Sequence, residues 1–361
     1  MASSNAAFSN GKFRALLIGL GGRSRGHAEG LLKSEGIEFA AACDIDAERR
    51  ARYEKDFGVR TYADAAEALQ KESPDIAIVC TREKPRYALA KLAVEHGVRA
   101  VVLEKPMAAN IREARDLVKQ CEERGVLLTV MHQMRFSDEF VAAKEAIASG
   151  AIGTPYYVRA VSYGHLMEQG PHMIDMILYL LGEPKAQWVM GQVADREEGL
   201  TTVHPAPAFV TGYIAFENGV RASVECGRRF PSAVGVFEDD AKAPTWLQKR
   251  VQVIGTDGIC DAMVAHYCRV MNGSGGWKTL TSGPDGWNAA TIRHYQEVVK
   301  VLREGGEHRN GAAPSLAGFE IIHGIYTSAL VGDVVNVPVV GGNEEPIESL
   351  LAPARKAQQT A

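Results

Sequence analysis

Short apolar runs alternate with amphipathic stretches along the first third of this chain of 361 residues. The apolar runs predict buried strands, and the stretches between them carry apolar residues at helical spacing. The predicted strands are Arg14–Gly19, Glu38–Cys43, Ile76–Cys80, Ala100–Leu103 and Leu127–Met131. The predicted helices are His27–Ser34, Ala47–Phe57, Ala63–Lys71, Arg86–His96 and Ile111–Glu123. Continuous apolar strands separated by helices predict a doubly wound parallel sheet covered on both faces.

The pattern changes after Phe136. A helix is expected over Ser137–Gly150, and β-rich runs follow it. Two of these runs are joined by Asn218-Gly219, the strongest short hairpin signal. The runs are Tyr156–Ser162, Gln187–Val193, Phe209–Phe216, Val220–Cys226 and Val251–Ile254. The helices expected among and after them are Met173–Leu181, Trp287–Leu302 and Leu316–Leu330. This part therefore predicts a mostly antiparallel sheet with a few helices.

The change of pattern divides the chain into two expected domains. A flexible tail of residues 1–11 precedes a doubly wound α/β domain over residues 12–135. An α+β domain over residues 136–340 follows, and residues 341–361 are expected to form a loosely attached polar tail. The loop of residues 228–250 fits a lid, an oligomer contact or neither role.

Composition narrows the classes of function. A net charge of −4 spread along the chain leaves no basic patch for nucleic acid and no polybasic stripe for a membrane. Apolar runs such as Met173–Leu181 are too short to span a bilayer. The first ten residues are small and polar, which is typical of a frayed tail rather than a targeting segment. The six cysteines form no CxxC pair, so we expect buried free thiols and a cytoplasmic location.

A glycine-rich turn follows the first predicted strand and precedes the first predicted helix. Its sequence, Gly19-Leu20-Gly21-Gly22-Arg23-Ser24, matches GxGxxG at the first two glycines and has a serine at the third. Such a turn brings backbone N–H groups at a helix N-terminus to a pyrophosphate. A glycine turn of an α/β domain can also bind nothing. The order of strand, turn and helix favours dinucleotide binding by Gly19, Gly21, Gly22, Arg23 and Ser24.

Asp44 ends the second predicted strand. A carboxylate at this position accepts hydrogen bonds from the adenosine ribose and repels a 2′-phosphate. Asp44 therefore favours NAD over NADP as the cofactor. Arg49 and Arg50 could neutralise a phosphate, so NADP stays an alternative.

Glu104-Lys105-Pro106 is a second signal, directly after the predicted strand Ala100–Leu103. The carboxyl edge of a parallel sheet is where ligands of such folds bind. A lone lysine is usually a solvated surface charge, but a glutamate and a proline beside it at a strand end favour a functional role. Lys105 next to a nicotinamide could orient a substrate hydroxyl and ease its proton loss. We also predict Thr81 and Glu104 on the cofactor side.

Four residues with acid–base chemistry gather in one short segment: His165, Glu168, His172 and Asp175. Pro171 suits the first turn of a helix that would place His172 and Asp175 on one face. His172 is the natural general acid–base group. Zinc or iron could use the same residue types, but Gly170-Pro171 interrupts the helical spacing, and we assign no metal. A satisfied histidine beside a helix-capping carboxylate is the other alternative.

Together these residues resemble the glucose–fructose oxidoreductase, inositol dehydrogenase and MocA family. The resemblance covers about Phe13 to Leu330. It rests on Ile18-Gly19-Leu20-Gly21-Gly22-Arg23, Glu104-Lys105-Pro106, His132-Gln133-Met134-Arg135-Phe136 and His172-Met173-Ile174-Asp175. It implies an N-terminal Rossmann domain, a C-terminal domain with an open-faced, mostly antiparallel sheet, and a homo-oligomer, either a dimer or a tetramer.

The resemblance also implies roles for individual residues. The family's lysine maps onto Lys105 and its catalytic histidine onto His172, and the Lys105–Pro106 peptide is implied to be cis. Family members commonly carry an aspartate four residues before that histidine, where this chain has Glu168. The proline and histidine usual after the fourth strand are absent, and Thr81-Arg82-Glu83-Lys84-Pro85-Arg86 stands there.

The residues and the resemblance together predict a NAD(P)-dependent oxidoreductase that acts on a ring carbon of a sugar, cyclitol or related polyol. In this hypothesis His172 takes the hydroxyl proton and Lys105 holds that oxygen. Glu168 orients His172 or binds a neighbouring hydroxyl. The substrate contacts are predicted to come from Arg135, Tyr163, His165 and Asp175. For Trp277 and Trp287 simple packing is the better interpretation than stacking on a sugar.

Three other functions fit parts of the sequence. A redox-cycling glycosidase that keeps NAD bound would need the same residues. A non-catalytic sensor would bind the dinucleotide for regulation, but the presence of both Lys105 and His172 argues against it. A metal hydrolase would use the cluster between His165 and Asp175.

Overall fold

The computed structural model of the chain describes residues 11–198, 206–227, 248–273, 275–282, 287–342 and 344–359. Contacts divide these residues into two compact units. Unit 1 comprises the described residues within Met1–Ala109, Glu113–Gln133 and Asn288–Ala312, and unit 2 those within Asn110–Arg112, Met134–Trp287 and Ala313–Ala361. The expected N-terminal tail, except residue 11, and most of the 228–250 loop lie outside the described residues.

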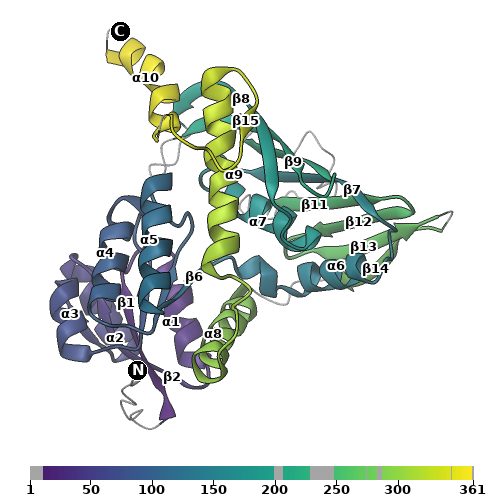
Figure 1. The fold of residues 1–361 in the computed structure, drawn as a ribbon. Coiled ribbons are helices and arrows are strands. Elements are labelled where there is room, and N and C mark those ends of the chain that lie inside the picture. Colours follow the sequence, from purple (N-terminus) through teal and green to yellow (C-terminus); the bar gives the residue numbers. More distant parts are fainter. Residues whose placement is uncertain are drawn as a thin grey trace. The chain divides into compact units, whose positions relative to one another are not determined.

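Unit 1 is built on a six-stranded sheet in which all neighbouring strands are parallel. Its order is β3-β2-β1-β4-β5-β6, which is the doubly wound order of dinucleotide-binding folds. The strands are β1 Phe13–Ile18, β2 Ile37–Cys43, β3 Arg60–Tyr62, β4 Ile76–Val79, β5 Ala100–Leu103 and β6 Leu127–Val130. The helices between them are α1 Ser24–Lys33, α2 Ala47–Phe57, α3 Ala65–Glu72, α4 Glu83–Glu95 and α5 Ile111–Arg124 (Figure 1). The predicted parallel α/β fold is confirmed.

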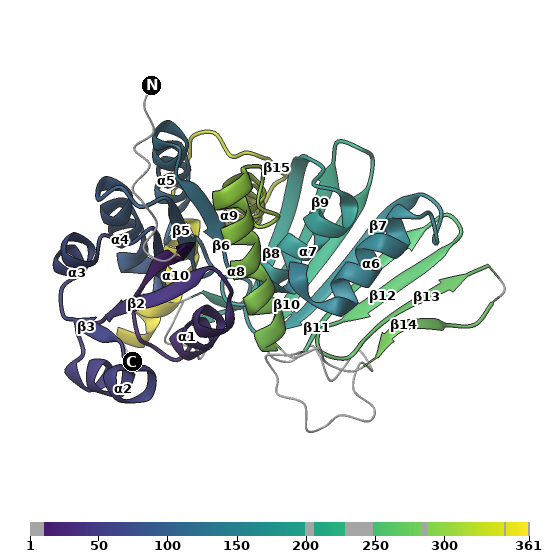
Figure 2. The same ribbon diagram turned by 90° about the horizontal axis from the view of Figure 1, so that it is seen from below.

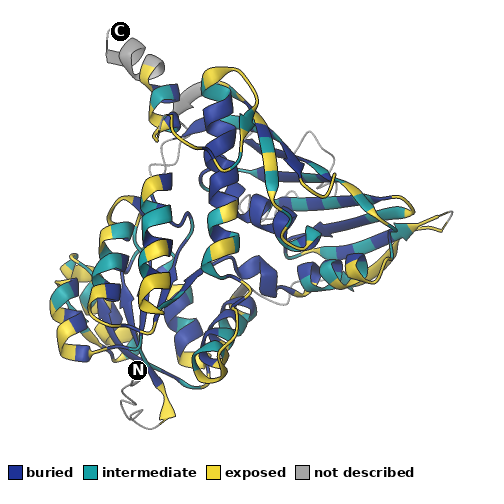
Figure 3. Cartoon of the chain, in the orientation of Figure 1, coloured by how far each residue is buried: buried dark blue, intermediate teal, exposed yellow. Residues whose placement is uncertain are grey.

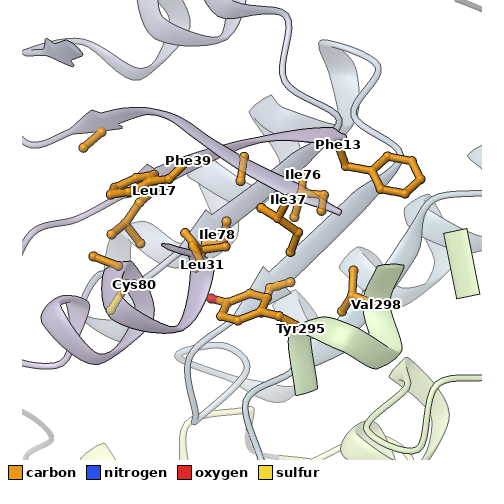
Figure 4. Close-up of a cluster of buried hydrophobic side chains, with 14 of the residues drawn as sticks. Phe13, Leu17, Leu31, Ile37, Phe39, Ile76, Ile78, Cys80, Tyr295 and Val298 are labelled. Carbon is orange, nitrogen blue, oxygen red and sulfur yellow. The ribbon is translucent and has the colours of Figure 1, made fainter. Parts of the chain in front are cut away.

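A late helix completes the core of unit 1. Helix α8, Trp287–Glu304, contributes Tyr295, Val298 and Val299 to a buried cluster that also contains Phe13 and Ile78 of the sheet (Figure 4). Helix α1 packs closely against α8, because a Cβ at Gly30 would lie 2.8 Å from Thr291 Cγ2. Unit 1 therefore buries side chains that are far apart in the sequence.

The contact units differ from the boundary expected near residue 135 in where they place α8. The prediction assigned all of residues 136–340 to the second domain, whereas Asn288–Ala312 belongs to unit 1. The alternation of strands and helices ends near residue 131, and amphipathic periodicity alone does not say which sheet a helix covers.

Unit 2 contains a nine-stranded sheet in the order β14-β13-β12-β11-β7-β10-β9-β8-β15. Only β7 and β10 pair in parallel, and the other neighbouring strands are antiparallel. The strands are β7 Pro155–Tyr163, β8 Ala186–Glu198, β9 Pro207–Phe216, β10 Arg221–Gly227, β11 Lys249–Gly255, β12 Gly258–Met263, β13 Tyr267–Asn272, β14 Lys278–Ser282 and β15 Val335–Asn336 (Figure 2). The predicted mostly antiparallel sheet is confirmed.

One face of this sheet is covered by helices α6 Asp138–Ala148, α7 Gly170–Leu181 and α9 Ala312–Val331. Residues such as Ala160, Val224 and Val253 point to that face and are fully buried. Their neighbours along the strands, such as Arg159 and Glu225, are half-buried and lie on the opposite face. Figure 3 shows buried and intermediate positions along these strands. This alternation is the period of two expected for a sheet with one covered face.

Details of the second half differ from the sequence prediction. The Asn218-Gly219 turn joins β9 and β10 as expected, and Gly219 has φ +85°. Strands β12, β13 and β14 were not predicted. Helix α10, Pro346–Gln359, occupies the range expected to be a loose tail, and its Leu350 and Leu351 are buried.

All six cysteines are free and buried, as predicted. Among the described helices, none combines the length and the apolar character that crossing a membrane would require.

Candidate active site

The glycine turn between β1 and α1 has the backbone that the sequence predicts. Gly19 has φ +94°, and a Cβ there would lie 2.8 Å from Cys80 O, so only glycine fits. At Gly21 and Gly22 a Cβ would meet no heavy atom of the described residues within 4 Å. The turn therefore buries Gly19 and leaves Gly21, Gly22 and the adjoining N-terminus of α1 accessible from outside.

Ser24 stabilises the turn through its side chain. Its hydroxyl donates to Gly21 O at 2.5 Å and accepts from the Tyr53 hydroxyl at 2.6 Å. The serine is fully buried at the first position of α1. Its hydroxyl is thus already used inside the protein, and any cofactor contact of Ser24 would come from its backbone.

Asp44 lies directly after β2 and accepts a hydrogen bond from the glycine turn. Its Oδ2 accepts a hydrogen bond from Leu20 N at 2.6 Å, and its Oδ1 accepts one from Asp46 N at 2.9 Å. Arg49 Nη1 lies 3.6 Å from Oδ2. A carboxylate fixed in this way stands where a Rossmann fold binds the adenosine ribose.

Lys105 follows β5 and is half-buried. Its backbone N–H donates to Glu104 Oε2 at 3.2 Å, and the Lys105–Pro106 peptide is cis, as the resemblance implied. Strand β5 lies beside β4, and β4 lies beside β1. The carboxyl ends of these strands therefore bring Lys105, Thr81 and the glycine turn to one edge of the sheet.

Glu104 is the centre of a buried hydrogen-bond network. Its Oε1 accepts from Arg23 Nε at 3.1 Å and from His27 Nε2 at 3.0 Å. His27 Nδ1 lies 2.5 Å from the Tyr295 hydroxyl of α8. Burial alone would raise the pKa of Glu104, but the His27 hydrogen bond and the Arg23 charge hold that pKa well below its usual range. Glu104 is therefore a carboxylate.

The state of His27 follows from its two partners. Burial lowers the pKa of His27, and the Glu104 carboxylate only partly opposes that shift. A carboxylate only accepts hydrogen bonds, so Nε2 of the neutral ring carries the proton and Nδ1 accepts from the Tyr295 hydroxyl. Sequence reasoning missed both residues, because their contact joins positions 268 residues apart.

Arg86 of α4 is a second residue that sequence reasoning missed. Its guanidinium is buried, and it donates from Nη1 to Pro106 O and from Nη2 to Thr81 O. Burial lowers the pKa of Arg86, and the Glu104 charge opposes that shift. Arg86 stands in the segment where the sequence departs from the family pattern, and that departure was the available signal.

In unit 2, His172 lies in the first turn of α7 and is buried. His165 Nε2 lies 3.6 Å from Glu168 Oε2, in the loop that leads to α7. Tyr163 is the last residue of β7, is half-buried, and donates its backbone N–H to Gln248 O at 3.0 Å. The structure thus brings His165 and Glu168 together as a pair.

Arg135 and Asp175 also meet, but inside unit 2. Arg135 Nε and Nη2 donate to the Asp175 carboxylate at 2.7–3.0 Å, and Nη1 donates to Glu183 Oε1 at 2.6 Å. The Arg135 side chain is 3% exposed. Burial alone would lower the pKa of Arg135, but the Asp175 charge overcomes this and raises it. These contacts favour a structural role over the predicted substrate contact.

One group of described residues has ligand spacing for a metal. Atoms of His27, Cys80 and Glu104 lie within 4.8 Å of one another and are buried. Burial raises the pKa of the Cys80 thiol well above its usual value, so the sulfur stays protonated. This set fits an internal hydrogen-bond network better than a metal centre. The four residues of the rival metal hypothesis, His165, Glu168, His172 and Asp175, do not form such a group.

The sequence matches the two domain models of one protein family. Residues 13–132 match a model described as an oxidoreductase family with an NAD-binding Rossmann fold, and residues 159–261 match the GFO/IDH/MocA C-terminal domain. Together these ranges span more than half of the chain. The chain belongs to the Gfo/Idh/MocA family of oxidoreductases.

Several Gfo/Idh/MocA relatives resemble the chain over most of its length. It is 27% identical to D-apiose dehydrogenase from Paraburkholderia graminis over 354 residues, which cover 90% of each chain. It is 25% identical to myo-inositol 2-dehydrogenase from Thermotoga maritima, covering 67% of this chain and 72% of the relative. Levoglucosan dehydrogenase, solved with NADH and levoglucosan, shares the fold with a TM-score of 0.78 at 20% identity, covering 91% of this chain and all of that one.

Proposed function

We propose that this protein is a NAD-dependent dehydrogenase that transfers a hydride between the nicotinamide and a ring carbon of a sugar, cyclitol or related polyol. The observation that carries the proposal is the shared sheet edge, at which Lys105, Thr81 and the glycine turn meet. The relatives named for D-apiose and myo-inositol support the substrate class. NADP is the alternative cofactor.

The residues of unit 1 fit a dinucleotide. The open glycines Gly21 and Gly22 and the N-terminus of α1 would hold the pyrophosphate, and Asp44 would accept from the ribose hydroxyls. Thr81 and the Glu104–Lys105 segment would stand on the nicotinamide side. When bound, the nicotinamide supplies the hydride acceptor or donor.

In this proposal Lys105 and His172 have separate roles in the reaction. The Lys105 ammonium donates a hydrogen bond to the substrate oxygen and stabilises negative charge that develops there. The His172 imidazole accepts the hydroxyl proton during oxidation and returns it during reduction. Glu168, paired with His165, binds a neighbouring hydroxyl or orients His172.

The first experiment is an assay of the purified protein with NAD or NADP and a panel of D-apiose, other sugars, inositols and aryl glycosides. We expect reduced nicotinamide to accumulate with one class of polyol. Release of the aglycone at constant total NADH would instead identify the redox-cycling glycosidase. Cofactor binding without either reaction would identify a dinucleotide sensor.

The Lys105→Ala variant tests the chemical assignment. General acid–base and electrostatic groups of this kind contribute about 10²- to 10⁴-fold, so we expect kcat to fall by that factor while the Kd for NAD changes little. Lys71→Ala is the matched control, because Lys71 is an exposed lysine of the same unit that pairs with Glu67. Turnover of Lys105→Ala within a few-fold of wild type would contradict the assignment.

We further propose that the protein is a homo-oligomer that associates through the face of the unit 2 sheet opposite α6, α7 and α9. This face carries aromatic and charged residues, with the stacked pair Trp188 and Tyr213 and the ion pair Arg159–Glu225, and Met190 on it is 47% exposed. The solution mass by light scattering should correspond to a dimer or tetramer, and Tyr213→Glu should lower it. A monomer at micromolar concentration would contradict this proposal.

A cytoplasmic location is the last part of the proposal. Six free, buried cysteines suit a reducing compartment, because an oxidising one favours disulfides. Fractionation of the native host should recover the activity with cytoplasmic markers, and recovery elsewhere would contradict it.

A further inference from the structure

Arg86 of α4 is a buried arginine on a helix that is partly exposed. It lies on a helix whose neighbouring residues Lys84 and Tyr87 are at least partly exposed, yet its own side chain is 2% exposed. Burying a guanidinium is costly unless hydrogen bonds compensate for the lost water. Its partners are two backbone carbonyls rather than a carboxylate, namely Pro106 O and Thr81 O. Its Nε has no hydrogen-bond partner among the described residues, which adds to the cost.

The two carbonyls belong to the two loops that matter for the proposed reaction. Thr81 follows β4 and Pro106 follows β5, and these strands are neighbours in the sheet. The planar fork of an arginine can bridge two acceptors in a fixed geometry, which a lysine cannot do. Arg86 therefore ties the segment that carries Lys105 to the loop expected on the nicotinamide side.

The same segment is held from a second direction. Glu104 accepts from His27 and Arg23 through Oε1, while its Oε2 accepts the backbone N–H of Lys105. His27 is itself fixed by the Tyr295 hydroxyl. Lys105 thus lies between Glu104, whose side chain is held by hydrogen bonds, and Pro106, whose carbonyl accepts a hydrogen bond from Arg86.

We propose that Arg86 and His27 are positioning residues that hold Glu104-Lys105-Pro106 from its two sides and so set the place of the Lys105 ammonium. The inference rests on the proposed function, because it assumes that Lys105 acts in the reaction. Both residues act through this segment and do not touch the reacting atoms.

The first test compares Arg86→Gln and Arg86→Lys with wild type. Because a displacement of about 1 Å in a catalytic group can cost about 100-fold, we expect Arg86→Gln to lower kcat by about 10- to 100-fold with the Kd for NAD changed by less than about threefold. Arg86→Lys should be intermediate, since it keeps the charge but not the fork. A folded Arg86→Gln or Arg86→Lys with kcat within twofold of wild type would overturn the proposal.

Arg14→Gln is the matched control. Arg14 of β1 also donates to a backbone carbonyl, Glu72 O at 3.2 Å, but it lies at the amino ends of the strands. We expect this variant to lose stability while keeping kcat. An equal loss of kcat in Arg14→Gln would show that the Arg86 effect is merely structural and would overturn the proposal.

His27 is tested by rescue. His27→Gln can still donate from its amide to Glu104, whereas His27→Leu cannot, so kcat should be restored at least tenfold in the former relative to the latter. Tyr295→Phe should lower kcat less than His27→Leu does. It keeps the His27 ring but removes the Tyr295 hydroxyl that orients this ring. Equal kcat values for His27→Gln and His27→Leu would overturn the role of His27.

A readout without turnover separates this inference from the proposed function. Amide hydrogen exchange of the peptide that contains Lys105 and Met107 should become at least tenfold faster in Arg86→Gln and unchanged in Arg14→Gln. If the wild-type protein turns over no substrate but shows this pattern, the proposed function fails and the positioning of Lys105 stands. Unchanged exchange in Arg86→Gln would overturn the positioning, whatever the activity.

Discussion

Arg135 and Arg86 are both buried arginines, yet their partners differ in kind. Arg135 donates to the carboxylates of Asp175 and Glu183, which are opposite charges of its own unit. Arg86 donates to two backbone carbonyls at the edge where the cofactor is expected. A guanidinium enclosed by carboxylates stabilises the fold, whereas one that ties two loops together determines their positions.

The Arg135→Met variant tests the structural role of Arg135. Removing one partner leaves the buried Asp175 without its main counter-charge, which costs about 3–5 kcal/mol of stability for pairs of this type. We expect that loss in urea denaturation, with the KM for substrate changed by less than about threefold. A large rise in KM with little loss of stability would instead restore the substrate-contact hypothesis.

The double variant Arg135→Met/Asp175→Asn is the internal control. The Asp175→Asn substitution replaces the carboxylate with an uncharged amide, so neither charge of the buried Arg135–Asp175 pair remains when both residues are changed. The double variant should therefore be more stable than the sum of the two single losses predicts, by about 1 kcal/mol or more for residues in direct contact. Additive losses would mean that the two side chains do not depend on each other.

Sequence reasoning at this scale found residues that lie within a motif and missed those defined by contact. Lys105 and the glycine turn follow predicted strands, so their shared edge could be predicted from the strand order alone. The role of His172 stays a prediction that rests on its chemistry and on the resemblance. In the sequence His27 is a polar residue of one predicted helix, and Tyr295 is an aromatic residue of another predicted helix far along the chain. Their hydrogen bond exists only because α8 folds back onto α1.

At the scale of elements, the crossing of α1 and α8 requires a glycine, Gly30, at the point of contact. Gly30 lies where a Cβ would be 2.8 Å from Thr291 Cγ2 and 3.3 Å from the Tyr295 ring. Alanine is the better helix former, so glycine at a helix interior position has a packing reason here. The close approach is what lets the Tyr295 hydroxyl reach His27.

Gly30→Ala should therefore destabilise the protein although alanine favours helices. Overpacking of this kind costs about 1–3 kcal/mol. Gly26→Ala is the matched control in the same helix, because its Cβ would meet only the end of the Arg23 side chain, at 3.3 Å. It should be neutral or stabilising by up to about 1 kcal/mol. Equal free energies of unfolding for the two variants would contradict the tight crossing.

The elements of unit 1 could be predicted almost completely, because buried parallel strands are continuous apolar runs. Unit 2 was predicted less completely. Strand β12 has the sequence Gly-Ile-Cys-Asp-Ala-Met and buries Asp261, which pairs with Arg250 and Arg269. A buried charge inside a strand weakens the alternation that marks it.

Helix α4 begins at Glu83 rather than at the predicted Arg86. The helix can include Pro85 because proline is tolerated in a first helical turn.

For the whole molecule, α8 makes unit 1 a discontinuous structure. Its buried residues Tyr295 and Val298 share one core with the strands of the parallel sheet. Residues that share a core open together, because exposing one partner exposes the other. We therefore expect α8 to behave as part of unit 1 rather than with the rest of the C-terminal half.

Native-state hydrogen exchange tests this expectation. Peptides of α8 should exchange with the same opening free energy as those of β1 and β2, and NAD should raise the protection of all three together by linkage. Peptides of α9, which belongs to unit 2, serve as the comparison. Protection of α8 that followed α9 instead would contradict the assignment of α8 to unit 1.

The discontinuity of unit 1 also has a consequence for how the protein is made. A ribosome that has finished β6 must still add the roughly 170 residues up to the end of α8, which takes about 9 to 35 s at about 5–20 residues per second. Throughout that interval the nascent parallel sheet lacks the helix that covers Leu31 and Ile78. The exposed apolar surface is a natural site for chaperone binding during synthesis. Release of the full chain and acquisition of the ability to bind dinucleotide should then occur at nearly the same time.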